Sequence, residues 1–161
     1  MLRIRLLTVG LILIVFGAIG AVNPEPGVVK AALKNFQREN LIRLHVIANS
    51  DSPRDQMVKL KVRDRVIRFT EPLLLKVEDP ETAKEILKHN RAALEAVARA
   101  ELVRRGRPMA VRVLLGEYQF PERSYPFGVL PAGKYQAVRI ILGAGAGKNW
   151  WCVLYPPLCL L

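Results

Sequence analysis

One strand-like segment, residues 41–48, is separated from every other strand candidate by a long region of predicted helices, residues 52–106. In its sequence, LIRLHVIA, Arg43 and His45 alternate with apolar residues, which is typical of a strand that is buried on at least one face. The other strand candidates are residues 110–120, 135–142 and 150–155. The order of strand, helices and three strands predicts an α+β (or α/β) single domain, with two to three helices packed on one mostly β sheet.

The helical region between these strands carries clear start signals. Ser52-Pro53, with Asp55 three residues after the serine, predicts a helix that runs to about residue 75. Apolar residues at helical spacing form its buried face: Val58, Val62, Val66, Phe69 and Leu73. The opposite face carries basic residues: Lys59, Lys61, Arg63 and Arg68. Asp79-Pro80 begins a second helix, and Asn90 is predicted to cap a third that stops at Gly106.

The N-terminus is predicted to be an export segment. Arg3 and Arg5 precede an apolar run over residues 6–22 that only Thr8 interrupts, as in a signal peptide or a membrane anchor. Cleavage is left open, because residues 18–20 fit a cleavage site while the run is also close to the roughly 20 residues that span a bilayer. The predicted organisation is therefore a signal or anchor helix (1–22), a linker with a short helix (23–40) and one folded domain (41–161).

The chain of 161 residues has a formal net charge of +11. Export would place +9 of this charge outside the cytoplasm, since the export segment holds only Arg3 and Arg5 among the charged residues. Nucleic acids are not ordinary partners there, and Phe69 is the sole aromatic residue of the basic stretch 53–77, so a base-stacking groove is not indicated. We therefore expect no nucleic-acid partner, but compatibility with an anionic membrane surface or an acidic protein.

A polar turn follows the first strand, where sheets often place ligands and where a helix start offers N–H groups. It holds Asn49, Ser50 and Asp51, with His45 shortly before them. A hydrolase would use Ser50 as nucleophile, or His45 and Asp51 as metal ligands, but the chain has two histidines and neither a G-x-S-x-G nor an H-E-x-x-H motif. The favoured interpretation is structural: Asn49 and Asp51 order the turn through hydrogen bonds to the backbone. Binding is the next alternative.

The glycine-rich segment 143–148 does not fit a phosphate-binding loop, because Leu142 and Asn149 stand where that motif needs glycine and serine or threonine. We predict a flexible hairpin-type connection between the strands on either side of it.

The last strand candidate leads into a segment with two cysteines. Cys152 and Cys159 either form a disulfide around Pro156 and Pro157, or remain small buried thiols. Because Trp150 and Trp151 alternate along a strand, one ring is expected in the core while the other faces out or covers a neighbour. An outward tryptophan near Tyr155 is a candidate protein contact.

Two ordered groups of motifs resemble the stage II sporulation protein R family of endospore-forming bacteria. The first is LHVIANSDS at residues 44–52, followed by Asp55-Gln56 and LKVRD at 60–64. The second comprises Phe120-Pro121, LPAG at 130–133 with Tyr135, Ala137 and Arg139, and GKNWWCVLYPPLC at 147–159. The resemblance covers about residues 41–159.

The resemblance implies an exported signalling protein that is not an enzyme. Such proteins pass from the forespore into the space between forespore and mother cell, where they trigger a membrane-embedded aspartic-type protease that processes the precursor of a mother-cell sigma factor. We expect no catalytic residues, metal or cofactor, and the candidate partner-binding residues are His45, Asn49, Ser50, Asp51, Trp150, Trp151 and Tyr155. The alternatives are a small exported hydrolase that uses His45 and Asp51, or a cell-envelope binding module.

Overall fold

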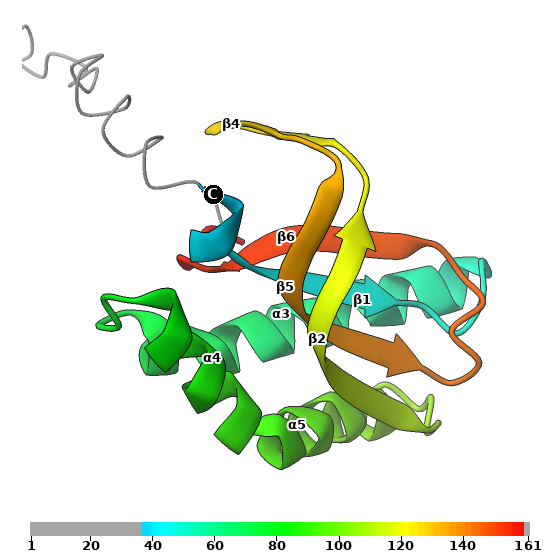
Figure 1. Ribbon diagram of the computed structural model, residues 1–161. Helices are drawn as coiled ribbons and strands as arrows, with labels where there is room; N and C mark the ends of the chain where they lie inside the picture. Colours follow the sequence, from blue (N-terminus) through cyan, green and yellow to red (C-terminus); the bar gives the residue numbers. More distant parts are fainter. Residues whose placement is uncertain (1–36, 160–161) are drawn as a thin grey trace, which may run out of the picture. The chain divides into compact units, whose positions relative to one another are not determined.

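The computed structural model describes residues 37–159 (Figure 1). A 3₁₀ turn, η1 (Arg38–Asn40), and strand β1 (Ile42–Ile47) are followed by helices α3 (Pro53–Leu74), α4 (Pro80–His89) and α5 (Arg91–Arg104). The remaining elements are strands β2 (Val111–Phe120), β3 (Arg123–Tyr125), β4 (Gly128–Leu130), β5 (Gly133–Leu142) and β6 (Asn149–Tyr155). The predicted export segment 1–22 and most of the predicted linker 23–40 lie outside the described residues.

The main sheet has four strands in the order β2-β5-β1-β6. Strand β1 pairs with β5 in parallel and with β6 in antiparallel orientation, and β2 pairs antiparallel with β5. The isolated first strand of the sequence thus lies between two strands from the C-terminal part of the chain. Figure 1 shows the three helices on one side of this mixed sheet. The predicted α+β class is confirmed.

The glycine-rich segment 143–148 is not a hairpin connection, contrary to the prediction. Strands β5 and β6 are not neighbours, because β1 lies between them. The segment instead passes the end of β1, where the amides of Ala146 and Gly147 donate to the carbonyls of Asn49 and Ala48 over 3.1 and 2.9 Å. Glycine content indicated a turn, but it carried no information on which strands the turn would join.

The helix start signals are confirmed by hydrogen bonds. Ser52 accepts from the amide of Asp55 at 3.2 Å, and Asp79 accepts from the amide of Thr82 at 2.8 Å. Asn90 is the N-cap residue of α5, as predicted, but its side chain does not cap that helix: it donates to the carbonyl of Ile86 at 2.8 Å and so closes α4. At a joint between two helices, the last carbonyls of the first helix and the first amides of the second both lack helical partners. The N–H₂ group of Asn90 donates to one of these carbonyls.

The main core lies between the helices and one face of the sheet. Val58, Val62 and Val66 of α3 pack in it against Leu44 and Val46 of β1, as the helical spacing predicts. Lys59 was predicted on the solvated face of α3, but its side chain is buried. Because Lys59 flanks the apolar face, the segment that precedes β6 covers it, and its ammonium donates to the carbonyl of Lys148 at 3.0 Å.

A second, smaller core covers the opposite face of the sheet. Its buried members are Leu41, Phe120, Leu130, Tyr135, Ala137 and Val153. Figure 1 shows the long strands β2 and β5 bending away from the helices, with the short β3–β4 hairpin beyond their ends. This hairpin was not predicted from the sequence, because strands of three residues are too short to show an alternation.

Among the described residues, no helix is both long enough and apolar enough to cross a membrane.

Candidate partner-binding site

Asp55, in the first turn of α3, organises the turn that follows β1. Its buried carboxylate accepts hydrogen bonds from the side chains of Asn49 and Ser50, both at 2.7 Å, and from Arg107 at 2.5 Å. The hydrogen bonds from Asn49 and Ser50, helped by the guanidinium of Arg107, lower the pKa of Asp55 to about 2. The sequence indicated only the capping position of Asp55. Its role as the acceptor for three side chains depends on Arg107, which is distant in the chain.

The turn residues also bind the glycine-rich segment. The side-chain oxygen of Asn49 accepts from the amide of Ala144 at 2.9 Å, and that of Asp51 accepts from the amide of Lys148 at 2.6 Å. A side chain at Gly147 would collide with the main chain of Ser50, so the close approach requires glycine there. Asn49 and Asp51 therefore connect two loops through backbone hydrogen bonds.

His45 is held in a buried aromatic setting. Its ring stacks on Trp151 with the centroids 3.7 Å apart, and its Nε2 lies 2.7 Å from the side-chain oxygen of Asn149. Burial lowers the pKa of His45 to about 4. The imidazole is consequently neutral at pH 7, and it carries its proton on Nε2 because an amide oxygen can only accept.

The structure does not bring His45 and Asp51 together. His45 bonds to Asn149, whereas Asp51 bonds to Lys148 and, over 3.4 Å, to Gln56. Within residues 37–159, no three side chains of His, Cys, Asp or Glu converge to hold a metal ion. The described residues therefore lack the pairing that the hydrolase hypothesis requires.

The aromatic residues of β6 have separate environments. Trp150 lies on the helix side, where the guanidinium of Arg63 is 4.0 Å from its ring centroid, while Trp151 covers His45 on the other side. Tyr155 is only 6% exposed, and its hydroxyl donates to the carbonyl of Val77 at 3.2 Å. Tyr155 thus belongs to the core and offers a partner little surface.

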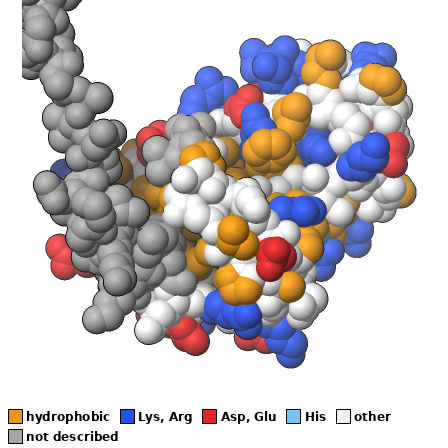
Figure 2. Space-filling view, turned by 90° about the horizontal axis from the view of Figure 1, so that it is seen from above, with side chains coloured by type: hydrophobic (Ala, Val, Ile, Leu, Met, Phe, Trp, Pro, Cys, Tyr) orange, Lys and Arg blue, Asp and Glu red, His pale blue; other side chains and the backbone are white. Residues whose placement is uncertain are grey.

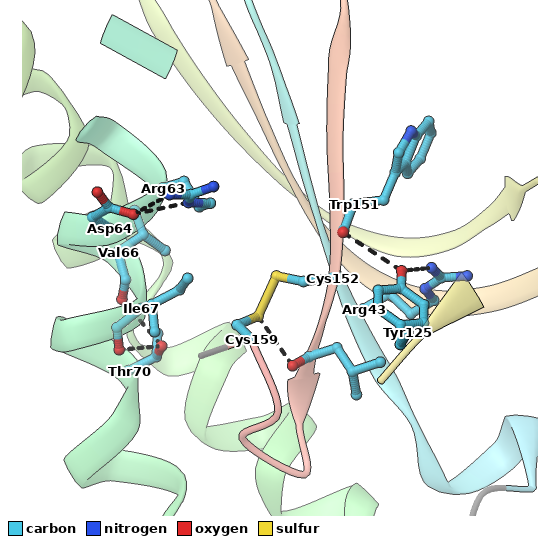
Figure 3. Close-up of a disulfide and its surroundings, with 11 residues drawn as sticks. Arg43, Arg63, Asp64, Val66, Ile67, Thr70, Tyr125, Trp151, Cys152 and Cys159 are labelled. Carbon is cyan, nitrogen blue, oxygen red and sulfur yellow. Dashed lines mark hydrogen bonds and ion pairs between the residues drawn. A yellow bond between two sulfur atoms is a disulfide. The ribbon is translucent and has the colours of Figure 1, made fainter. Parts of the chain in front are cut away.

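Cys152 and Cys159 form a disulfide, with their Cα atoms 5.3 Å apart. The sequence had left this pairing open against two buried thiols. The bridge ties the segment after Tyr155 back onto β6, and the amide of Leu158 donates to the carbonyl of Val153 at 3.3 Å. Figure 3 shows the disulfide on one side of β6, with Trp151 and Tyr125 on the other.

Arg43 is a buried cation that sequence analysis placed on a strand but did not single out. Its side chain is fully buried among the rings of Phe120, Tyr135 and Tyr125, whose centroids lie 4.3, 4.9 and 5.7 Å from the guanidinium carbon. It donates to the hydroxyl of Tyr125, but Nε and Nη1 have no hydrogen-bond partner among the described residues. Burial lowers the pKa of Arg43. The alternation of Arg43 and His45 with apolar residues was the sequence signal that could have indicated this environment, since it puts both side chains on one face of β1.

A hollow of about 420 Å³ lies between β3 and the outer strand β6. We call it the β3–β6 groove, and its lining residues are Arg123, Ser124, Tyr125, Asn149, Trp150, Trp151, Cys152, Leu158 and Cys159. Of the candidate contact residues, Trp150 and Trp151 line this groove, whereas Asn49, Ser50 and Asp51 do not. The residues from β3 were missed together with the hairpin that carries them.

Comparison with known proteins identifies the family. A sequence model of stage II sporulation protein R matches residues 38–161. The chain belongs to the stage II sporulation protein R family. It is 37% identical over 123 residues to stage II sporulation protein R of Bacillus subtilis (strain 168), and the alignment covers 76% of this chain and 55% of that protein. This chain therefore spans about half the length of that relative. No solved structure matches the chain.

The fold explains why two distant motifs mark this member of the stage II sporulation protein R family. The first motif forms β1, the polar turn and the start of α3, and the second includes β6 and the disulfide loop. Strands β1 and β6 are neighbours, with His45 opposite Trp151 in the register. The two motifs are thus one structural unit, and the β3–β6 groove lies at its outer edge.

Proposed function

We propose that this chain is an exported signalling protein of sporulation that activates a membrane-embedded aspartic-type protease. The activated protease would process the precursor of the mother-cell sigma factor. The observation that carries the proposal is membership of the stage II sporulation protein R family across residues 38–161. The protein acts as a ligand in this proposal, in keeping with the separate hydrogen-bond partners of His45 and Asp51.

The proposed location is the space between forespore and mother cell, with the chain either secreted or anchored in the membrane. Arg3, Arg5 and the apolar run over residues 6–22 support export. The disulfide between Cys152 and Cys159 supports a compartment more oxidising than the cytoplasm.

The surface charge fits a location beside a membrane. Figure 2 shows Lys and Arg side chains spread over several parts of the visible face, with hydrophobic side chains between them. Such a distributed positive surface is attracted to anionic headgroups without requiring a specific site. We therefore include an anionic membrane surface as a second, weaker partner in the proposal.

The test is co-expression in a bacterium that does not sporulate. The full chain is produced together with the membrane-embedded protease and the sigma-factor precursor, and processing is followed by immunoblot. We expect the mature sigma factor only when all three proteins are present.

A variant without residues 2–22 provides the control for export. It keeps the described domain but loses the proposed export segment, so we expect no processing. Processing that continues without this chain would refute the activating role, and full processing with the truncated variant would refute the proposed location.

A further inference from the structure

The open edge of β6 forms one wall of the β3–β6 groove. Within residues 37–159, strand β6 is an outer strand of the sheet and pairs with β1 alone. The carbonyl of Trp151 points away from β1, since the hydroxyl of Tyr125 approaches it to 3.5 Å from the groove side. Further along, the carbonyl of Val153 already accepts from the amide of Leu158. The disulfide loop therefore closes the edge at one end. Over residues 149–151 the outward main-chain groups have no main-chain partner among the described residues, and the carbonyl of Trp151 accepts only the long hydrogen bond from Tyr125.

An open strand edge is a template for another extended chain. Main-chain groups of the added strand pair with those of the edge, and neighbouring pockets select its side chains. The volume of the β3–β6 groove, about 420 Å³, lies within the range of roughly 300–1,000 Å³ that is usual for binding clefts. Trp150, Leu158 and the disulfide add apolar surface along the edge.

The charge of the groove selects for acidic side chains. Arg123 lines the wall opposite β6, and no Asp or Glu is among the described lining residues. Arg123 forms no ion pair with any residue in the described part of the chain. Behind Tyr125 lies Arg43, a second cation without a carboxylate partner there (Figure 3). An incoming carboxylate would thus meet the guanidinium of Arg123, which no described acid neutralises, while the buried charge of Arg43 adds to the positive potential from behind Tyr125.

We propose that the β3–β6 groove binds an extended, acidic segment of the partner protein, which adds to β6 as a further strand and pairs a carboxylate with Arg123. This inference rests on the proposed function, because the partner is the membrane-embedded protease that the protein activates. The segment belongs to the part of the protease that is exposed on the receiving side.

Photo-crosslinking in the co-expression system tests the contact directly. A photoreactive benzoylphenylalanine replaces Ser124, which lines the groove, in the full chain. The matched control carries the same group in place of Val103, which is 60% exposed on α5 and is not a lining residue. We expect a crosslink to the protease from position 124 but not from position 103, and mass spectrometry should locate it within an acidic segment. Adducts with lipid or a second copy of this chain, or equal yields at both positions, would overturn the inference.

Charge reversal tests the role of Arg123. Arg123→Glu should lower processing about tenfold or more, because it turns an attraction at the edge into a repulsion. Arg112→Glu makes the same change at an exposed position of β2, the outer strand at the opposite edge, and should stay within about twofold of the parent chain. If processing depends on this chain but both variants behave alike, the groove inference fails while the proposed function stands. If processing does not depend on the chain at all, the proposed function itself fails.

Discussion

The two faces of the central sheet are built on different principles. On the face toward the helices, β1 contributes Ile42, Leu44 and Val46 to an aliphatic core. On the opposite face, the same strand contributes Arg43 and His45, which are equally buried but lie among aromatic rings. One strand of six residues thus supplies both a conventional core and a polar, aromatic one.

The aliphatic face stabilises the fold, whereas the polar, aromatic face leads to a surface that can bind a partner. Burial of aliphatic side chains is the main favourable term in folding, whereas burial of a cation or of a neutral imidazole costs free energy that contacts must offset. The rings around Arg43 and the stack on His45 offset part of that cost. The polar face also leads directly to the β3–β6 groove, through Tyr125 and Trp151.

The largest effect on stability is expected on the aliphatic face. Leu44→Ala removes a fully buried side chain, so the free energy of unfolding should fall by about 3 kcal/mol. Leu114→Ala is the control, because Leu114 is 40% exposed and its loss should cost less than about 1 kcal/mol. Urea unfolding followed by tryptophan fluorescence measures both values. Equal losses would show that the helix-side core does not dominate stability.

The disulfide stabilises β6, the strand that both faces share. Replacing Cys152 and Cys159 together by serine should lower the free energy of unfolding by roughly 2–3 kcal/mol through the loop-closure entropy of the unfolded chain. The unfolding experiment is run on the parent chain with and without reductant, and on the double variant. Reductant should destabilise the parent but leave the double variant unchanged. A mass of the unreduced parent that corresponds to two free thiols would contradict the bridge.

His45 should make the stability of the polar face depend on pH. Its pKa is about 4 in the folded chain and near 6.5 in an unfolded one, so between these values the unfolded state binds more protons. Stability therefore rises as the pH increases from 4 to 6.5, by about 2 kcal/mol in the free energy of unfolding. Asp55 does not contribute in this window, because lowering its pKa to about 2 affects stability mainly below pH 4.

Two histidine variants isolate this effect in unfolding curves recorded at several pH values. His45→Gln keeps an amide donor for Asn149 but cannot titrate, so the slope between pH 4 and 6.5 should flatten. His89→Gln changes an exposed histidine and should retain the parental slope. A parental slope in His45→Gln would mean that the buried imidazole is not its source.

Local signals predicted the elements of the aliphatic face well. The caps at Ser52 and Asp79, the helical spacing of α3 and the alternation in β1 each depend on residues close in sequence. Strand order was not predictable in this way, because nothing in the glycine-rich segment shows that β1 lies between β5 and β6. The burial of Lys59 depends on that same segment, and it was missed for the same reason.

The candidate site was predicted only where single residues stood out. Trp150 and Trp151 do line the groove, because an unusual pair of rings on a strand is visible in sequence. The surroundings of Arg43 were not visible, since its rings come from β2, β3 and β5, which are distant in the chain. The polar turn residues were interpreted first as structural and second as a contact surface, and their hydrogen bonds to Asp55 and to the glycine-rich segment agree with the first interpretation.

The smallest change in stability is expected for Arg43→Met, although this side chain is as buried as Leu44. Methionine fills a similar volume among the rings, and it removes a guanidinium with two nitrogens that lack acceptors in the described part of the chain. Replacing a buried charge by an apolar side chain of similar size is often neutral or stabilising, so the free energy of unfolding should change by less than about 1 kcal/mol.

Arg43→Ala is the matched variant, because it removes the charge and also leaves a cavity. It should be less stable than Arg43→Met by about 2 kcal/mol, and urea unfolding of both proteins under the same conditions measures the difference. A loss of several kcal/mol in Arg43→Met itself would mean that the cation holds the aromatic core together. Both faces of the sheet would then be needed for stability, and they would differ only in the residue types that they bury. If Arg43→Met is neutral, the fold tolerates this cation without requiring it, which leaves the positive charge behind Tyr125 free to serve recognition at the groove.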